Sequence, residues 1–119
     1  MLAKMFSVDC LKITDWESFH DEFAATFGFP YFYGRNMNAW IDCMTSLDQP
    51  EDGMTCIHAA RGQTLTLQLD NVVPFRESHP DLYAAIIECA AFVNWRRLEV
   101  GEPSVLSISF SSSGERRKS

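Results

Sequence analysis

Three short segments of the chain alternate apolar and polar residues, which is the pattern of a β-strand with one buried face. They are Lys4–Asp9, Thr64–Leu69 and Val105–Phe110. The second is the clearest, because Leu65, Leu67 and Leu69 share one face and polar residues the other. Strands covered on both faces would instead be continuous apolar runs. The alternation therefore predicts a three-stranded sheet that helices cover on one face only.

Two helices are predicted between the first and second strands. The first begins at a capping box, in which the Thr14 hydroxyl and the Glu17 carboxylate satisfy free backbone N–H groups. It ends at Gly28, and the second helix begins at Asn36 as its N-cap. The apolar stripe of this second helix consists of Met37, Trp40, Ile41, Met44 and Leu47. Such a stripe gives the helix one side to pack against the sheet.

A third, long helix is predicted between the second and third strands, from about Ser78 to about Trp95. The order strand–helices–strand–helix–strand implies parallel neighbouring strands joined by right-handed crossovers. The sequence therefore predicts a two-layer α/β fold over residues 1–110, with a three-stranded parallel sheet and helices on one face. The segment Asp48–Gln63 has no clear periodicity, and Thr55–His58 within it could form a short strand paired with the second strand.

The chain has 119 residues, which suits one domain, and a formal net charge of −6. Residues 111–119 form a basic tail of net +2 with no apolar residue to bury, so we expect this tail to be disordered. The remaining residues, 1–110, then carry −8. Nucleic-acid binding requires clustered cations, so this acidic body argues against it. The charge favours a basic protein partner, or serves solubility alone.

No segment approaches the roughly 20 apolar residues of a membrane span, and the first residues lack the features of a signal peptide. A cytoplasmic location without membrane contact is therefore expected. The four cysteines are Cys10, Cys43, Cys56 and Cys89. They could form two disulfides, but reduced thiols are favoured in that compartment. None has a second Cys or a His at metal-ligand spacing, so no metal and no cofactor is expected.

The sequence carries no catalytic motif. Three histidines and four cysteines could supply a Cys–His site, yet no spacing joins them. Cys43 and Cys89 lie in predicted helices, where a thiol is usually a small core residue. His20 on the first helix is expected to be packed or solvated. The chain is therefore not expected to be an enzyme, and a thiol-dependent or hydrolytic activity stays open as an alternative.

The segment from Pro30 to Leu47 combines an aromatic loop with a polar helix face. Three aromatic residues lie between Pro30 and Asn36, where exposed rings would be good binding anchors. Tyr33 among them is expected to staple the first two helices together. On the second helix, a turn of 100° per residue gives one polar face beside the apolar stripe. This face consists of Asn38, Asp42 and Thr45, with Ile41 at its boundary.

Residues 29–45 (Phe-Pro-Tyr-Phe-Tyr-Gly-Arg-Asn-Met-Asn-Ala-Trp-Ile-Asp-Cys-Met-Thr) resemble the signature of the barstar family, the intracellular inhibitors of barnase-like ribonucleases. That signature is a Pro, an aromatic pair, Gly-x-Asn, an apolar residue, an acid, Ala and then Asp-Cys-Leu-Thr. Weaker similarity near residues 13–20 and 107–110 extends the resemblance over about two-thirds of the chain.

The resemblance implies that the aromatic loop and the second helix block the active site of a ribonuclease. Asp42 matches the family's central acid, which takes the place of a substrate phosphate and faces cations of the enzyme. The expected partner-binding residues are Phe32, Tyr33, Gly34, Arg35, Asn38, Ile41, Asp42, Thr45 and Glu88. We expect Asp42 to be exposed in the free protein and unpaired with any cation strong enough to occupy it.

The chain departs from the family pattern at three of these positions. Phe32 lacks a hydroxyl group, Asn38 replaces an acid and Ile41 replaces a tryptophan. The segment Asp48–Gln63 also has no counterpart in the small inhibitor. The expected partner is a barnase-like ribonuclease or a related toxin, bound by a chain that is monomeric when free. The alternative is a barstar-fold interaction module whose partner is not a ribonuclease.

Overall fold

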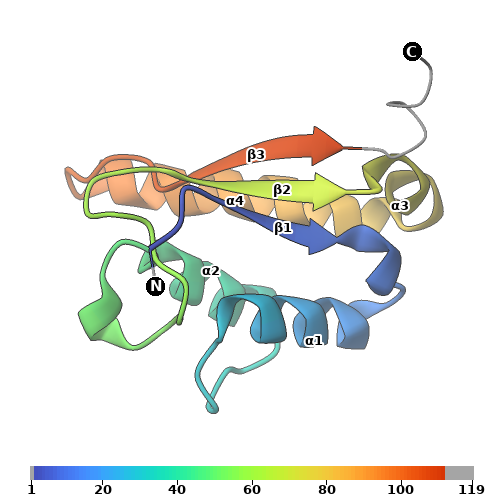
Figure 1. Cartoon of the computed structure of the whole chain (residues 1–119), viewed down its shortest axis with the longest axis horizontal. Helices are drawn as coiled ribbons and strands as arrows, with labels where there is room; N and C mark the ends of the chain where they lie inside the picture. The colour runs from blue at the N-terminus through green and yellow to red at the C-terminus, as the bar shows by residue number, and fades with distance from the viewer. Residues whose placement is uncertain (1, 112–119) are drawn as a thin grey trace.

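The computed structural model describes residues 2–111, which form a parallel sheet and its covering helices (Figure 1). The strands are β1 (Met5–Asp9), β2 (Leu65–Asp70) and β3 (Leu106–Ser111). The α-helices are α1 (Trp16–Phe27), α2 (Met37–Thr45), α3 (Val72–Ser78) and α4 (Pro80–Glu99), with short 3-10 helices at Cys10–Lys12 and Pro50–Asp52. The strands pair in the order β1-β2-β3, all parallel, which confirms the predicted three-stranded parallel sheet.

The central strand shows that one face of the sheet meets the core. Leu65, Leu67 and Leu69 of β2 are completely buried, whereas the residues between them are only partly covered. On the open face, the hydroxyl groups of Thr66 and Ser107 bond each other across β2 and β3 at 2.7 Å. In Figure 1, α4 runs behind the strands and α1 and α2 lie below them. The alternation in sequence thus reports the two faces correctly.

Aromatic side chains join the first two helices inside the core. Phe19 and Phe23 of α1 are fully buried, and their ring centroids lie 4.9 Å apart. The ring of Phe23 also meets Trp40 of α2 edge-on at 5.6 Å. Burying each such side chain stabilises the fold by roughly 1.5–3 kcal/mol. The apolar stripes of both helices therefore fix their positions under the sheet.

The start of α1 differs from the prediction. Asp15, not Thr14, is the N-cap, because its carboxylate accepts the backbone N–H of Ser18 at 2.8 Å. Ser18, not Glu17, completes the capping box, and its hydroxyl oxygen accepts the backbone N–H groups of both Thr14 and Asp15. The Ser18 side chain therefore takes the capping role that the sequence analysis assigned to Thr14 and Glu17. Gly28 as the end of α1 and Asn36 as the N-cap of α2 are as predicted.

Gly28 ends α1 in the left-handed conformation, with φ of 69°. A Cβ atom at this position would lie 2.6 Å from the Cβ atom of Cys56, so the close approach also requires glycine. Asn36 caps α2 by accepting the backbone N–H of Ala39 at 2.8 Å. The two caps fix both ends of the loop that precedes α2.

Four further features of the fold were not predicted correctly. Helix α3 follows β2 directly and was missed, because only Val72 and Phe75 of its seven residues are buried. The proposed extra strand at Thr55–His58 is wrong, since His58 makes only an isolated parallel bridge with Leu2. Helix α4 continues past Trp95 to Glu99. Ser111, placed in the predicted tail, is the last residue of β3, and the rest of that tail lies outside the described residues.

A buried ion pair anchors the segment Asp48–Gln63. Arg97 of α4 and Asp48 are 2% and 4% exposed, and their Nη2 and Oδ2 atoms lie 2.9 Å apart. Arg97 also donates to the carbonyl oxygen of Thr45 at 2.8 Å and to that of Pro103 at 2.7 Å. Asp48 in turn accepts the backbone N–H of Gly62 at 3.0 Å. This network locks the carboxyl end of α2 beside that of α4, which positions the face carrying Asp42.

Candidate partner-binding site

The aromatic loop between α1 and α2 holds two exposed rings. Tyr31 is 100% exposed and Phe32 is 62% exposed. Their rings meet edge-on, with centroids 5.4 Å apart. Phe32 is thus accessible, as its assignment to the partner-binding residues requires. Tyr31 was missed, although its place among the loop aromatics could have suggested it.

Tyr33 points the other way and ties the loop to α1, as expected. Its hydroxyl group hydrogen-bonds Nδ1 of His20, and its ring centroid lies 4.7 Å from that of Phe29. His20 is buried, and desolvation together with nearby Arg35 lowers its pKa, so the imidazole is neutral at neutral pH. Burial likewise raises the pKa of Tyr33, so its phenol keeps its proton. Tyr33 therefore holds the loop in place; it is only half-buried, and its assignment to the partner-binding residues stays a prediction.

Removing the Tyr33 hydroxyl should destabilise the fold. We expect Tyr33→Phe to lower the free energy of unfolding by about 1 kcal/mol, because His20 loses its partner inside the protein. Urea denaturation measures the change, and Tyr31→Phe is the matched control because Tyr31 is fully exposed. Equal stability of the two variants would contradict the role of Tyr33 as a staple.

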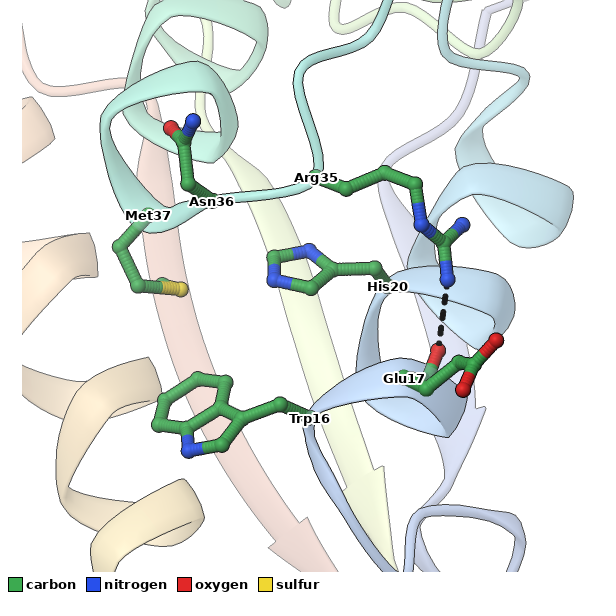
Figure 2. A pocket seen from close by; sticks show the side chains of 6 residues that line it. All are labelled: Trp16, Glu17, His20, Arg35, Asn36 and Met37. Carbon is green, nitrogen blue, oxygen red and sulfur yellow. Dashed lines mark hydrogen bonds between the residues drawn. The ribbon is translucent and has the colours of Figure 1, made fainter.

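Arg35 also attaches the loop to α1. Its Nη2 atom donates to the backbone oxygen of Glu17 at 3.1 Å and pairs with Asp21 at 2.9 Å. Figure 2 shows Arg35 and Glu17 on one side of a hollow of about 460 Å³, with Trp16 and Met37 on the other and His20 between them. The guanidinium group of Arg35 is therefore engaged with α1.

A second hollow, of about 190 Å³, brings the loop and α2 together. Phe32, Gly34 and Asp42 all line it, which confirms that the loop and the acid share one surface. Met54 lines it too, so the segment Asp48–Gln63 takes part in the site. Sequence reasoning missed Met54, because that segment has no periodicity from which its direction could be read.

On the polar face of α2, two of the four predicted residues are exposed as expected and the other two are more buried than expected. Asn38 and Asp42 are exposed. Thr45 is half-buried, and its hydroxyl donates back to the backbone oxygen of Ile41 at 2.6 Å. Ile41 is only 8% exposed and belongs to the core cluster, which corrects its assignment to the partner-binding residues. A branched apolar residue at the boundary of the apolar stripe turns inward to exclude water.

Asp42 has a cation partner, but one that holds it only at the surface. Its Oδ1 atom lies 3.0 Å from Nη2 of Arg96 on α4, while its side chain stays 55% exposed. The pair forms because α2 and α4 pack side by side and bring residues 54 positions apart together. Exposed pairs of this kind contribute about 0–1 kcal/mol. A stronger cation can therefore replace Arg96 at little cost.

Glu88 is exposed on α4, but the structure does not bring it next to Asp42. It lies eight residues before Arg96, which is about 12 Å along a helix axis at 1.5 Å per residue. Its assignment to the partner-binding residues stays a prediction, as an outlying contact.

The buried thiols have the properties of core residues. Burial raises the pKa of Cys10 to about 12 and that of Cys43 to about 11, so both remain protonated at neutral pH. Among residues 2–111, no three His, Cys, Asp or Glu side chains gather in a group that could hold a metal ion. None of the helices described here is long and apolar enough to cross a membrane.

Exposed aromatic rings beside a surface carboxylate, on a small α/β domain, are features that protein-binding surfaces commonly have. The family model described as Barstar (barnase inhibitor) matches residues 3–106, and the chain belongs to this family. A search of the curated proteins finds no match to the chain. The family fits the observed fold, in which four α-helices accompany a three-stranded parallel sheet.

Proposed function

We propose that the chain inhibits a barnase-like ribonuclease by covering its active site with the aromatic loop and α2. The observation that carries this proposal is the hollow that Phe32 and Asp42 line together. It places an exposed ring and an exposed carboxylate on one surface. Rings supply contact area at low entropic cost, and the carboxylate supplies the charge that a phosphate-binding site requires.

The mechanism follows from the chemistry of a ribonuclease active site. Such a site binds phosphates with cationic side chains, and the Asp42 carboxylate satisfies them without offering a bond to cleave. On binding, those cations replace Arg96, which holds Asp42 only through an exposed pair. The −8 carried by residues 1–110 steers the basic enzyme toward this face. Action in the cytoplasm stays a prediction from sequence.

The second candidate function is binding of a non-ribonuclease protein by the same face. Two observations favour it: Asn38 has no charge where the family has an acid, and Ile41 is buried where the family has a contact tryptophan. A face with one carboxylate fewer is suited to a less cationic site. Both candidates use Phe32 and Asp42, so identifying the partner decides between them.

Titration of barnase and a panel of barnase-like ribonucleases with the chain tests the proposal. We expect at least one enzyme to lose RNA cleavage in proportion to added chain, reaching zero at one chain per enzyme. A competing RNA substrate should slow this inhibition, because the chain and the RNA occupy the same site. If no enzyme of the panel is inhibited at micromolar chain, the ribonuclease proposal fails and the second candidate takes its place.

A further inference from the structure

Helix α4 carries two adjacent exposed aromatic side chains that the fold does not need. Phe92 is 43% exposed and Trp95 is 54% exposed. Their ring centroids lie 5.5 Å apart, with an angle of 30° between the ring planes. A single exposed apolar residue is common on protein surfaces, but a packed pair of large rings in water marks an interaction site.

The position of this pair follows from the hydrogen bonds on its two sides. Arg96 reaches Asp42 of α2, whereas Asn94 bonds the backbone of Leu106 in β3 and of Val105 just before it. At 100° per residue, Phe92 lies about 40° around the helix from Arg96. Trp95 lies about 100° from both Arg96 and Asn94 on the same count. The aromatic pair thus continues the surface of Asp42 across Arg96 and onto α4.

We propose that Phe92 and Trp95 form a second contact region for the protein that Asp42 binds, taking apolar surface beside that protein's cationic cleft. This inference rests on the proposed function and extends it. The interface then spans α2 and α4, with the Arg96–Asp42 pair between two sets of exposed rings, Tyr31 and Phe32 on the loop and Phe92 and Trp95 on α4. Aromatic residues around a central charge are the usual anchors of an interface.

Charge identifies the occupant as a basic protein and not a second copy of the chain. Glu88 and Glu99 are exposed on the same side of α4, about 20° and 40° around the helix from Trp95. Two copies meeting through this face would bring these acids together, on bodies that each carry −8. A protein with a cationic cleft compensates them instead.

The test uses the ribonuclease that the wild-type chain inhibits most tightly, with Trp95→Gln and Phe92→Gln as separate variants. We expect each to raise the dissociation constant about tenfold, mainly through faster dissociation. Both should unfold at the wild-type urea concentration, because the rings are exposed. The matched control is Phe110→Gln, which removes an exposed ring from β3, beside Tyr83 on the far side of α4 from Arg96. Its dissociation constant should stay within twofold of wild type.

The outcomes separate this inference from the proposed function. If Asp42→Ala weakens binding but both α4 variants stay within twofold of wild type, the inference is wrong and the proposed function stands. If no ribonuclease is inhibited, the proposed function fails and the inference fails with it. Sedimentation of the free chain is the third measurement, and a dimer that Trp95→Gln dissociates would show that a second copy covers the pair.

Discussion

Asp48→Ala is expected to lower the free energy of unfolding by about 3–5 kcal/mol, the cost of leaving one member of a buried ion pair alone. Arg97 would keep its bonds to the backbone oxygens of Thr45 and Pro103 but lose both bonds to the carboxylate. Its remaining acid is Glu102, at 3.5 Å and more exposed. Because Arg97 is 2% exposed, its guanidinium group would be left largely desolvated without that carboxylate.

Urea denaturation of the wild-type chain and three variants measures this effect. Glu51→Ala is the matched control, since it removes the same kind of pair, with Arg61 at 2.8 Å, from the surface. We expect this control to lose at most about 1 kcal/mol. The double variant Asp48→Leu with Arg97→Met should recover part of the loss, because no buried charge remains, although the backbone oxygens of Thr45 and Pro103 lose their donor. If Asp48→Ala were no less stable than Glu51→Ala, the network would not anchor the segment.

The same pair gives the stability a defined acid dependence. Burial alone would raise the pKa of Asp48, but the N–H of Gly62 and the Arg97 guanidinium outweigh it and hold the pKa below its ordinary value of 3.8. The folded protein therefore binds this proton more weakly than the unfolded chain does. The stabilisation is complete above that ordinary value and is lost as the pH falls through the lower folded value. Asp48→Ala should flatten this part of the stability profile.

Local patterns were enough to predict most of the fold. The alternation of Leu65, Leu67 and Leu69 follows directly from the two faces of a sheet. Gly28 and Asn36 end and begin helices through their own backbone and side-chain chemistry. Such features depend on residues a few positions apart, so sequence alone contains them.

Contacts between distant segments could not be predicted in the same way. Arg97 and Asp48 are 49 positions apart, and each would pass for a surface charge in the sequence. Their pairing explains why α4 runs past Trp95, since Arg97 must lie on its buried side to reach Asp48. Helix α3 was missed for a different reason: its two buried residues are too few to give a periodicity.

In the candidate site too, local features were predictable from sequence and contacts between distant segments were not. The exposure of Phe32 and Asp42 was predictable from loop position and helix periodicity. The Arg96 partner of Asp42 and the Met54 side of its hollow depend on how α2, α4 and the segment Asp48–Gln63 pack. The burial of Ile41 likewise reflects the packing of α2, because the residue lies where the polar and apolar faces meet.

Asp42→Ala is expected to weaken binding of the partner ribonuclease by about 2 kcal/mol or more, roughly thirtyfold. Folding should change by at most about 1 kcal/mol, because the side chain is 55% exposed and its pair with Arg96 lies at the surface. Truncation therefore separates binding from stability.

Variants of the same face test the reason for this loss. Asn38→Ala should cost less than Asp42→Ala, because an amide gives up hydrogen bonds but no charge. Arg96→Ala should leave binding intact or tighten it, since it frees Asp42 and removes a cation that repels those of the enzyme.

Added salt should slow association of all variants by screening the acidic body. Stopped-flow fluorescence measures the association rate of each variant, and urea denaturation measures its free energy of unfolding. Unchanged inhibition by Asp42→Ala would remove Asp42 from the site, and weaker binding by Arg96→Ala would show that the pair acts by orienting the carboxylate.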